Sequence, residues 1–362
     1  MFHLPTRIFF GSGALQEASD HIFKLGSKAL LVSGKRSAKA SGALDDVTKL
    51  LKGFAIPFAH FDQVPQNPDL DTIMAGAQLL RQEQCDYVIA IGGGSPIDAA
   101  KAMALVAANA LQRSQIYRIE LFRNALPLVA IPTTSGTGSE VTQYSVLTNP
   151  DTGIKAGFGH DLAFPRLAIC DPVYTHSLDC EVSLNTALDA LSHLLEGIYS
   201  NKRQALADPL IHAGARDIFE NLKAVLQNPA HISGREKLMR ASLYGGITIA
   251  QGSTTLQHSL GYPLTSKFGT PHGLSNALVM LPVMKLFAPA RKAELDALFA
   301  ALNMDMDGFA AWLESLNLPP APVLEDEFIA KSVQEVLGSR NMANNPLEVS
   351  AEQIRRIYQE LR

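Results

Sequence analysis

The sequence has little cysteine, no membrane-length apolar run and no strong excess of charge. Its three cysteines, Cys85, Cys170 and Cys180, are widely spaced and form no C-x-x-C pair, so we expect free thiols in a reducing compartment. The start, MFHLPTRIFFGSG, lacks the charged and apolar regions of a signal peptide. The apolar segment AMALVAANAL is flanked by Lys101 and by Gln112-Arg113, so it is too short to span a membrane. We therefore expect a cytoplasmic protein with no membrane partner.

The net charge of −4 is small for 362 residues, and no block of lysine and arginine follows a helix face. Such a chain supplies no electrostatic field for a phosphate backbone, so we expect no nucleic-acid partner. With 47% apolar and 18% charged residues, the composition is that of a globular protein. The length exceeds that of one typical hydrophobic core, which predicts two domains.

The first half alternates short apolar runs with helical patterns. The runs at 28–34, 86–94, 127–134 and 166–172 predict strands, several of them followed by glycine or small residues. This alternation predicts an α/β domain with a Rossmann-like parallel sheet, which binds ligands at the carboxyl ends of its strands. Residues 142–158 instead predict a hairpin, because Asn-Pro-Asp-Thr-Gly at 149–153 is a strong turn signal.

From about residue 180 the pattern becomes helical throughout. Helical periodicity covers 183–199, 205–226, 235–260, 272–287, 291–302, 306–315 and 350–361. The change predicts an α/β dinucleotide-binding domain at 1–179 and an all-helical domain at 180–362. We expect the active site in the cleft between the two domains.

Two loops of the first half have the composition of phosphate-binding loops. Ile-Gly-Gly-Gly-Ser-Pro-Ile-Asp at 91–98 joins a strand to a helix, and its glycines let a phosphate approach the free backbone N–H groups. Pro-Thr-Thr-Ser-Gly-Thr-Gly-Ser-Glu-Val-Thr at 132–142 follows the next strand and offers many hydroxyls. Each loop has a simpler reading, as a tight turn or as hydroxyls that satisfy their own backbone. Two such loops together favour a dinucleotide site.

Four residues of the second half form a candidate metal shell. Residues 183–199 predict an amphipathic helix, on which Asp189 and His193 leave the same face. His258 lies near the end of the predicted helix 235–260, before a Gly-Tyr-Pro helix stop at 261–263, and His272 lies at the start of the next helix. Three imidazoles and one carboxylate can bind Fe²⁺ or Zn²⁺ and leave a position open for substrate. The alternative for Asp189 and His193 is a surface hydrogen bond.

These motifs, taken in order, resemble the iron-containing (group III) alcohol dehydrogenases. The resemblance rests on PTRIFFGSG, GGGSPIDAAK, TTSGTGSEVT, the D-x-x-x-H helix and TPHG, and is nearest to the propanediol and short-chain alcohol dehydrogenase branch. It implies an α/β cofactor domain and a helical metal-binding domain. It also implies that Asp189, His193, His258 and His272 bind a divalent metal ion and act in catalysis through it. The expected ion is Fe²⁺, with Zn²⁺ as the alternative.

The resemblance further implies a set of cofactor-binding residues. Gly93, Gly94 and Ser95 would hold the pyrophosphate, and Asp98 would lie near the nicotinamide end. The cofactor's adenine and nicotinamide sides and its ribose would be contacted by side chains of the second loop and the hairpin, namely Thr133, Thr134, Ser139, Thr142 and Lys155.

The chain departs from the family pattern at two positions. Many relatives have a second histidine four residues after the third ligand, where this chain has Tyr262, so the route of proton release stays unassigned. Many NAD-dependent relatives have an aspartate after the first strand of the cofactor domain, where this chain has Gly34 followed by Lys35, Arg36 and Ser37. The missing carboxylate and the nearby cations favour NADP(H) over NAD(H), unless Lys35 and Arg36 form only a solvated loop.

The expected function is that of a metal-dependent alcohol dehydrogenase or aldehyde reductase. It would transfer hydride between a small primary alcohol or diol and NADP(H). The segments LSHLLEGIY and TTLQHSLGYPL contribute no lysine or arginine, which favours a neutral substrate and disfavours a dehydroquinate synthase-like enzyme. A glycerol dehydrogenase-like enzyme and a nucleotide-binding module with a structural metal are further alternatives. A homodimer is the expected oligomer.

Overall fold

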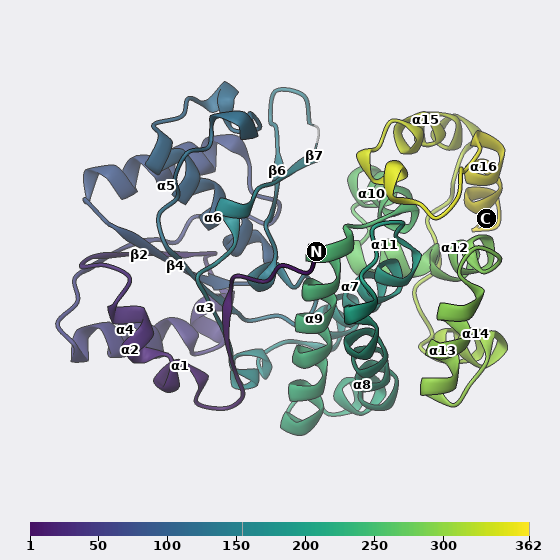
Figure 1. The fold of residues 1–362 in the computed structure, drawn as a ribbon, viewed down its shortest axis with the longest axis horizontal. Coiled ribbons are helices and arrows are strands. Elements are labelled where there is room, and N and C mark those ends of the chain that lie inside the picture. The colour runs from purple at the N-terminus through teal and green to yellow at the C-terminus, as the bar shows by residue number, and fades with distance from the viewer. Residues whose placement is uncertain (154, 362) are drawn as a thin grey trace. The chain divides into compact units, whose positions relative to one another are not determined.

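The apolar runs of the first half form one six-stranded parallel sheet (Figure 1). The computed structural model describes residues 1–153 and 155–361. The strands are β1 (Arg7–Phe10), β2 (Ala29–Ser33), β3 (Phe58–Phe61), β4 (Tyr87–Gly92), β5 (Leu128–Pro132) and β8 (Leu167–Cys170), in the order β1-β8-β5-β4-β2-β3. The predicted α/β sheet is confirmed. Strands β1 and β3 were missed, because each is a short edge strand with only one buried residue.

Alternate residues of β2, β4 and β5 face two different hydrophobic cores. Leu30 and Val32 belong to the core that contains the buried residues of α5 (Leu70–Gln82) and α6 (Gly94–Asn109). Leu31 belongs to the opposite core, which contains residues of α1 (Ala14–Glu17), α2 (Ser19–Phe23), α3 (Ser37–Ala40) and α4 (Ala43–Gly53). Burial on both faces explains why the parallel strands are continuous apolar runs rather than alternating ones.

The predicted hairpin is confirmed. Strands β6 (Tyr144–Thr148) and β7 (Lys155–Gly159) pair antiparallel, and the amide of Gly153 donates to the carbonyl of Asn149 in the turn. Gly153 has a φ of +69°, which a residue without Cβ adopts at no steric cost. Short 3₁₀ turns occur at Arg113–Gln115, Ile119–Leu121, Ser139–Val141, Asp161–Ala163, Pro172–Thr175, Ala205–Ala207 and Arg340–Asn344.

The second half is helical, as predicted. Its helices are α7 (Cys180–Tyr199), α8 (Asp208–Gln227), α9 (Ile232–Gly252), α10 (Leu256–Phe268), α11 (His272–Leu278), α12 (Met280–Phe287), α13 (Lys292–Leu302), α14 (Met306–Glu314), α15 (Asp326–Leu337) and α16 (Ala351–Gln359) (Figure 1). Helix α15 was missed by the sequence analysis. The predicted helix at 272–287 is divided into α11 and α12.

The prediction of one helix at 235–260 followed by a helix stop was wrong. The chain breaks at Ser253, which has a left-handed φ of +61°, and α10 then begins at Leu256. The Gly-Tyr-Pro sequence lies inside α10, with Pro263 in the helix interior. A proline there removes one backbone hydrogen bond, but Leu260, Pro263 and Leu264 are buried, so packing outweighs the local preference. His258 therefore lies in the first turn of α10 rather than near the end of a longer helix.

Helix α7 is buried on all sides over most of its length. Every residue from Ala187 to Tyr199 is buried, whereas the first turn is largely exposed. The prediction of an amphipathic helix was wrong for this part, because α8, α10 and α11 all pack against α7. The polar residues of α7 are consequently withdrawn from water and require polar partners.

The chain divides into two compact units. The sheet unit comprises Leu4–Leu178 and Pro229–Met239, and the helical unit comprises Met1–His3, Asp179–Asn228 and the chain from Arg240 onward. Met1–His3 is tied to the helical unit by two hydrogen bonds of 2.8 Å between the backbone of His3 and the side chain of Gln251. In the described part of the chain, no helix is long and apolar enough to cross a membrane.

Candidate functional site

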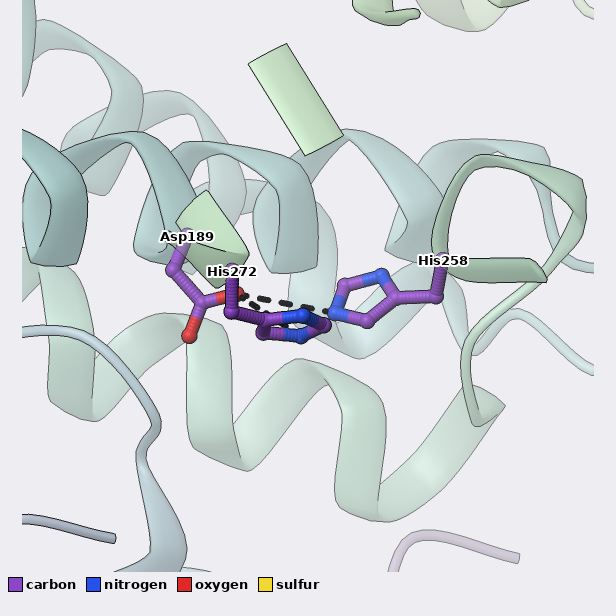
Figure 2. Close-up of side chains that lie close together, drawn as sticks. All are labelled: Asp189, His258 and His272. Carbon is purple, nitrogen blue, oxygen red and sulfur yellow. Dashed lines mark ion pairs between the residues drawn. The ribbon is translucent and has the colours of Figure 1, made fainter. Parts of the chain in front are cut away.

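Three helices of the helical unit bring the four predicted metal ligands together. Helix α7 carries Asp189 and His193, α10 carries His258 in its first turn, and α11 begins with His272. The Nε2 atom of His193 lies 3.9 Å from Asp189 Oδ1, and those of His258 and His272 each lie 3.6 Å from the same oxygen. Figure 2 shows Asp189, His258 and His272 converging. Residues far apart in the sequence thus surround one carboxylate oxygen.

Burial and ring packing hold this cluster in place. Asp189 and His193 are 5% exposed and His258 is 2% exposed, whereas His272 is half-buried. The rings of His193 and His258 stack with centroids 4.9 Å apart. Tyr262, the residue that departs from the family pattern, stacks on His272 with centroids 5.6 Å apart. The half-buried His272 is thus the most exposed member of the cluster.

The carboxylate and imidazoles shift each other's protonation. Burial alone would raise the pKa of Asp189, but the imidazoles of His193, His272 and His258 outweigh it and hold that pKa well below its usual range. Burial alone would lower the pKa of His258, but Glu196 and Asp189 outweigh it and raise that pKa to about 10. A cation is therefore favoured at this site, and a proton on His258 competes with a metal ion for the same imidazole.

Two further residues of the site were missed by the sequence analysis. The side-chain nitrogen of Asn276 lies 3.3 Å from Asp189 Oδ1, 3.2 Å from His258 Nε2 and 3.4 Å from His272 Nε2. The Glu196 carboxylate contacts His258 Nδ1. The spacing offered a signal for both: Glu196 follows His193 by three residues and Asn276 follows His272 by four, so each shares a helix face with a predicted ligand.

The predicted phosphate-binding loops lie side by side in the sheet unit, at the carboxyl ends of the neighbouring strands β4 and β5. Gly93 is the N-cap of α6, and Gly94 is its first residue. A Cβ at Gly93 would lie 3.1 Å from Thr134 Oγ1, and one at Gly94 would lie 2.7 Å from Thr137 Cγ2. A Cβ at Gly94 would force the Thr137 side chain to shift, and one at Gly93 would press on the Thr134 side chain. The N-terminus of the long helix α6 presents free N–H groups here, as a phosphate requires.

Hydrogen bonds connect the first loop with the hairpin. Asn67 links the two: its amide donates to Ser95 Oγ at 3.3 Å, and its side-chain oxygen accepts from Lys155 Nζ at 2.9 Å. Buried Asp98 accepts from the amide of Val146 at 3.0 Å. Burial raises the pKa of Asp98, against the opposing effect of nearby Lys101.

The second loop is held in a similar way. Ser139 hydrogen-bonds Asp98 through its side chain, and Thr142 Oγ1 accepts from Lys101 Nζ at 3.1 Å. The amide of Thr133 donates to the carbonyl of Gly92 at 3.0 Å. Among the predicted cofactor residues, Ser139 thus contacts Asp98 directly, Thr142 is joined to Asp98 through Lys101, and Ser95 is joined to Lys155 through Asn67. Lys101 and Asn67, which contribute to these connections, were not predicted.

The residues predicted to select the cofactor lie at the end of β2, the other neighbour of β4 in the sheet. Gly34 is half-buried, and a Cβ there would lie 3.3 Å from the carbonyl oxygen of Val64. Lys35, Arg36 and Ser37 are exposed, and α3 begins at Ser37. Two cations and a hydroxyl are therefore accessible at this strand end.

Comparison with known sequences covers both units. The family model described as iron-containing alcohol dehydrogenase matches residues 5–172. The model of the C-terminal part of the Fe-containing alcohol dehydrogenase family matches residues 183–361. The chain belongs to the iron-containing alcohol dehydrogenase family. The resemblance inferred from the motifs is confirmed, and the chain is an oxidoreductase of this family.

Individual proteins match the chain over its length. The NADPH-dependent butanol dehydrogenase of Clostridium saccharobutylicum is 28% identical over 380 residues, covering 99% of this chain and 97% of that protein. An iron-containing alcohol dehydrogenase from Thermotoga maritima has a crystal structure with a TM-score of 0.93 at 37% identity, covering 100% of this chain and 99% of the other. The crystal structure of the sulfoacetaldehyde reductase of Bifidobacterium kashiwanohense, in complex with NAD⁺, has a TM-score of 0.90 at 28% identity. It covers 100% of this chain and 98% of the other.

The iron-containing alcohol dehydrogenase family implies a bound metal ion, and the cluster around Asp189 fits one. Imidazole nitrogen and carboxylate oxygen are donors that suit both Fe²⁺ and Zn²⁺. Four donor atoms bound tetrahedrally at about 2.1 Å would lie about 3.4 Å from one another. The three distances from Asp189 Oδ1, 3.6 to 3.9 Å, are close to this value. The ligand atoms of Asp189, His258 and His272 all lie within 4.8 Å of one another, so these three need little movement to share one ion. His193 lies at the longest distance from Asp189 Oδ1, 3.9 Å, and is not part of this tighter group.

Proposed function

We propose that the chain is a metal-dependent alcohol dehydrogenase and aldehyde reductase that transfers hydride between a small neutral primary alcohol or diol and NADP(H). Asp189, His193, His258 and His272 hold one divalent ion, with Fe²⁺ the first choice and Zn²⁺ the second. The observation that carries the proposal is the placement of three imidazole Nε2 atoms within 3.9 Å of one buried carboxylate oxygen.

When bound, the ion supplies Lewis-acid chemistry toward an alcohol or aldehyde oxygen. The residues of the chain prepare the site for that role. Asp189 is the only anionic group among the four ligands, so the ligand set neutralises only part of a divalent charge and leaves the site cationic. The buried α7 and the first turn of α10 exclude water from His193 and His258. The half-buried His272 marks the accessible side.

A neutral substrate is favoured by the residues around the cluster. The turns of α7 and α10 next to the four ligands contain no lysine or arginine, so they offer no partner for a carboxylate, phosphate or sulfonate. A neutral substrate also agrees with the name of the butanol dehydrogenase described above, which gives an uncharged alcohol. The sulfoacetaldehyde reductase is named for an anionic aldehyde, which makes that compound a useful comparison.

The preference for NADP(H) rests on Gly34, Lys35, Arg36 and Ser37. Gly34 supplies no carboxylate at the end of β2, and the three residues that follow are exposed there. A 2′-phosphate meets no repulsion from Gly34 and finds cations and a hydroxyl close by. The residues proposed to bind the rest of the dinucleotide are Gly93, Gly94, Ser95, Asp98, Thr133, Thr134, Ser139, Thr142 and Lys155.

We also retain the homodimer as the proposed oligomer.

The experiment that tests this function measures NADPH oxidation by anaerobically purified protein, with and without added Fe²⁺ or Zn²⁺. The substrate panel contains propanal, butanal, 3-hydroxypropanal and sulfoacetaldehyde, and glycerol is tested in the oxidative direction. We expect metal-dependent reduction of the neutral aldehydes and little turnover of sulfoacetaldehyde. Protein that binds metal but reduces no aldehyde would contradict the proposal and favour a structural metal.

The ligand set is tested separately through the metal content of His258→Ala and His272→Ala. We expect each variant to lose bound metal, because each substitution removes one of the four donors. A variant whose metal content equals that of the unmodified protein would remove that histidine from the set.

A further inference from the structure

Glu196 is a fully buried carboxylate next to the metal cluster that has no place in the proposed ligand set. It lies on α7, three residues after His193, and its side chain is 0% exposed. Its Oε2 atom contacts His258 Nδ1. Its Oε1 atom accepts from the amide of Thr255 at 2.6 Å, from Thr255 Oγ1 at 2.8 Å and from the amide of His258 at 3.3 Å.

Every partner on this second oxygen is a donor. A carboxylate buried without donors would be strongly destabilised, so the arrangement stabilises the ionised form of Glu196. Thr255 is the N-cap of α10, and the amide of His258 lies in the first turn of that helix. One oxygen of Glu196 therefore anchors the start of α10, the turn that carries the ligand His258. The other oxygen contacts the His258 ring itself.

The contact with the ring determines which nitrogen of His258 has a free lone pair. An ionised carboxylate only accepts hydrogen bonds, so Nδ1 of His258 must carry the hydrogen. A neutral imidazole with hydrogen on Nδ1 has its lone pair on Nε2. Nε2 is the atom that lies 3.6 Å from Asp189 Oδ1, inside the cluster. In the opposite tautomer, an Nε2–H group would point into the cluster, and no lone pair would be available to a metal.

We propose that Glu196 is a positioning residue that holds His258 in the tautomer and orientation required for metal binding. The inference rests on the proposed function, because it assumes that His258 is a metal ligand. Glu196 itself does not touch the metal or the substrate in this assignment. Carboxylates that orient a ligating histidine typically change metal affinity 10- to 100-fold when removed.

The substitution Glu196→Gln separates this role from a merely structural one. Glutamine has nearly the same size, but it offers one acceptor oxygen and one NH₂ donor. The backbone amides of Thr255 and His258 cannot become acceptors, so the glutamine oxygen must remain on their side. The NH₂ group then faces His258 Nδ1, which must accept and so transfers its hydrogen to Nε2. The variant thus favours the tautomer that cannot bind metal.

The test measures zinc affinity by competition with a chromogenic chelator, without substrate or nucleotide. We expect the affinity of Glu196→Gln to fall about 10- to 100-fold. In protein with ¹⁵N-labelled histidine, His258 of the zinc-bound unmodified protein should carry its hydrogen on Nδ1 alone. Neutral His258 of metal-free Glu196→Gln should carry it on Nε2. The matched control is Glu181→Gln, which makes the same charge change at an exposed position in the first turn of α7 and should leave the affinity unchanged.

A second variant covers the case in which Glu196→Gln does not fold, as judged by circular dichroism. Glu196→Asp keeps the charge but withdraws the acceptor from His258 by one methylene, and it should also weaken zinc binding and leave a mixture of tautomers. Unchanged zinc affinity and an unchanged tautomer in either folded variant would overturn the inference while leaving the proposed function intact. Unmodified protein that binds no divalent ion would overturn both.

Discussion

Gly273 follows the proposed ligand His272 at the point where α11 packs against α7. A Cβ at this position would lie 1.7 Å from the carbonyl oxygen of Asn185, 2.7 Å from its carbonyl carbon and 3.1 Å from the amide nitrogen of Asp189. Close carbon–oxygen contacts in proteins are about 3.3 Å or longer, so Gly273→Ala requires α11 to move about 1.5 Å away from α7. The atoms in the way belong to the backbone of a packed helix and cannot rotate aside.

This displacement lowers the free energy of unfolding. Overpacking of a core by one methyl group destabilises by about 1–3 kcal/mol, and a backbone obstacle places Gly273→Ala near the upper limit. For a unit of this size we expect the Tm to fall by about 5–10 °C. The displacement also carries His272 away from Asp189. In the unmodified protein, His272 Nε2 and Asp189 Oδ1 lie 3.6 Å apart. Metal sites tolerate shifts of only about 0.2 Å in ligand distance, so bound metal should fall as well.

The assay combines thermal unfolding of the metal-free protein with metal analysis of the anaerobically purified protein. The control is Gly338→Ala in the same helical unit, where a Cβ would lie 3.5 and 3.6 Å from the nearest carbonyl oxygens. We expect that control to change the unfolding free energy by less than about 0.5 kcal/mol. If Gly273→Ala has the Tm and the metal content of the unmodified protein, the proposed close packing of α7 and α11 around the cluster is refuted.

Two further predictions concern the sheet unit. Burial raises the pKa of Glu140 from 4.5 to about 7, so its favourable contribution to folding is present below pH 4.5 and is lost as the pH rises through 7. Glu140→Gln should therefore increase the free energy of unfolding by about 2–3 kcal/mol more at pH 8 than at pH 4, and equal effects at the two pH values in denaturant titrations would contradict this. Gly34→Asp should lower the ratio of kcat/KM for NADPH to that for NADH at least about tenfold, because its carboxylate repels a 2′-phosphate. An unchanged ratio in a variant with normal Tm would remove Gly34 from cofactor selection.

Local patterns in the sequence predicted the features that depend on near neighbours along the chain. The continuous apolar runs predicted buried parallel strands, and Asn-Pro-Asp-Thr-Gly predicted the hairpin, because each pattern reports a backbone preference. The i,i+4 spacing of Asp189 and His193 placed both on one face of a helix. The same rule applied to Glu196 and Asn276 would have added them to the site.

Long-range packing decided the rest. Glu196 and His258 are 62 residues apart, and no spacing rule states that α7 and the first turn of α10 meet. The sequence suggested a helix stop at Pro263, but α10 continues past this residue because the side chains around it are buried. Helix α7 was predicted to have a solvent face, but three neighbouring helices cover it. These outcomes depend on the sum of many contacts between distant segments.

The sequence by itself thus determined the family, the parallel sheet, the glycine loops and the residue types of the candidate metal site. Only the tertiary structure decided that Asp189, His193, His258 and His272 converge on one oxygen, and that Glu196 lies behind His258. The physical reason is that residue type and spacing act through the local backbone. The position of a side chain relative to a distant one is set instead by how buried helices pack against each other.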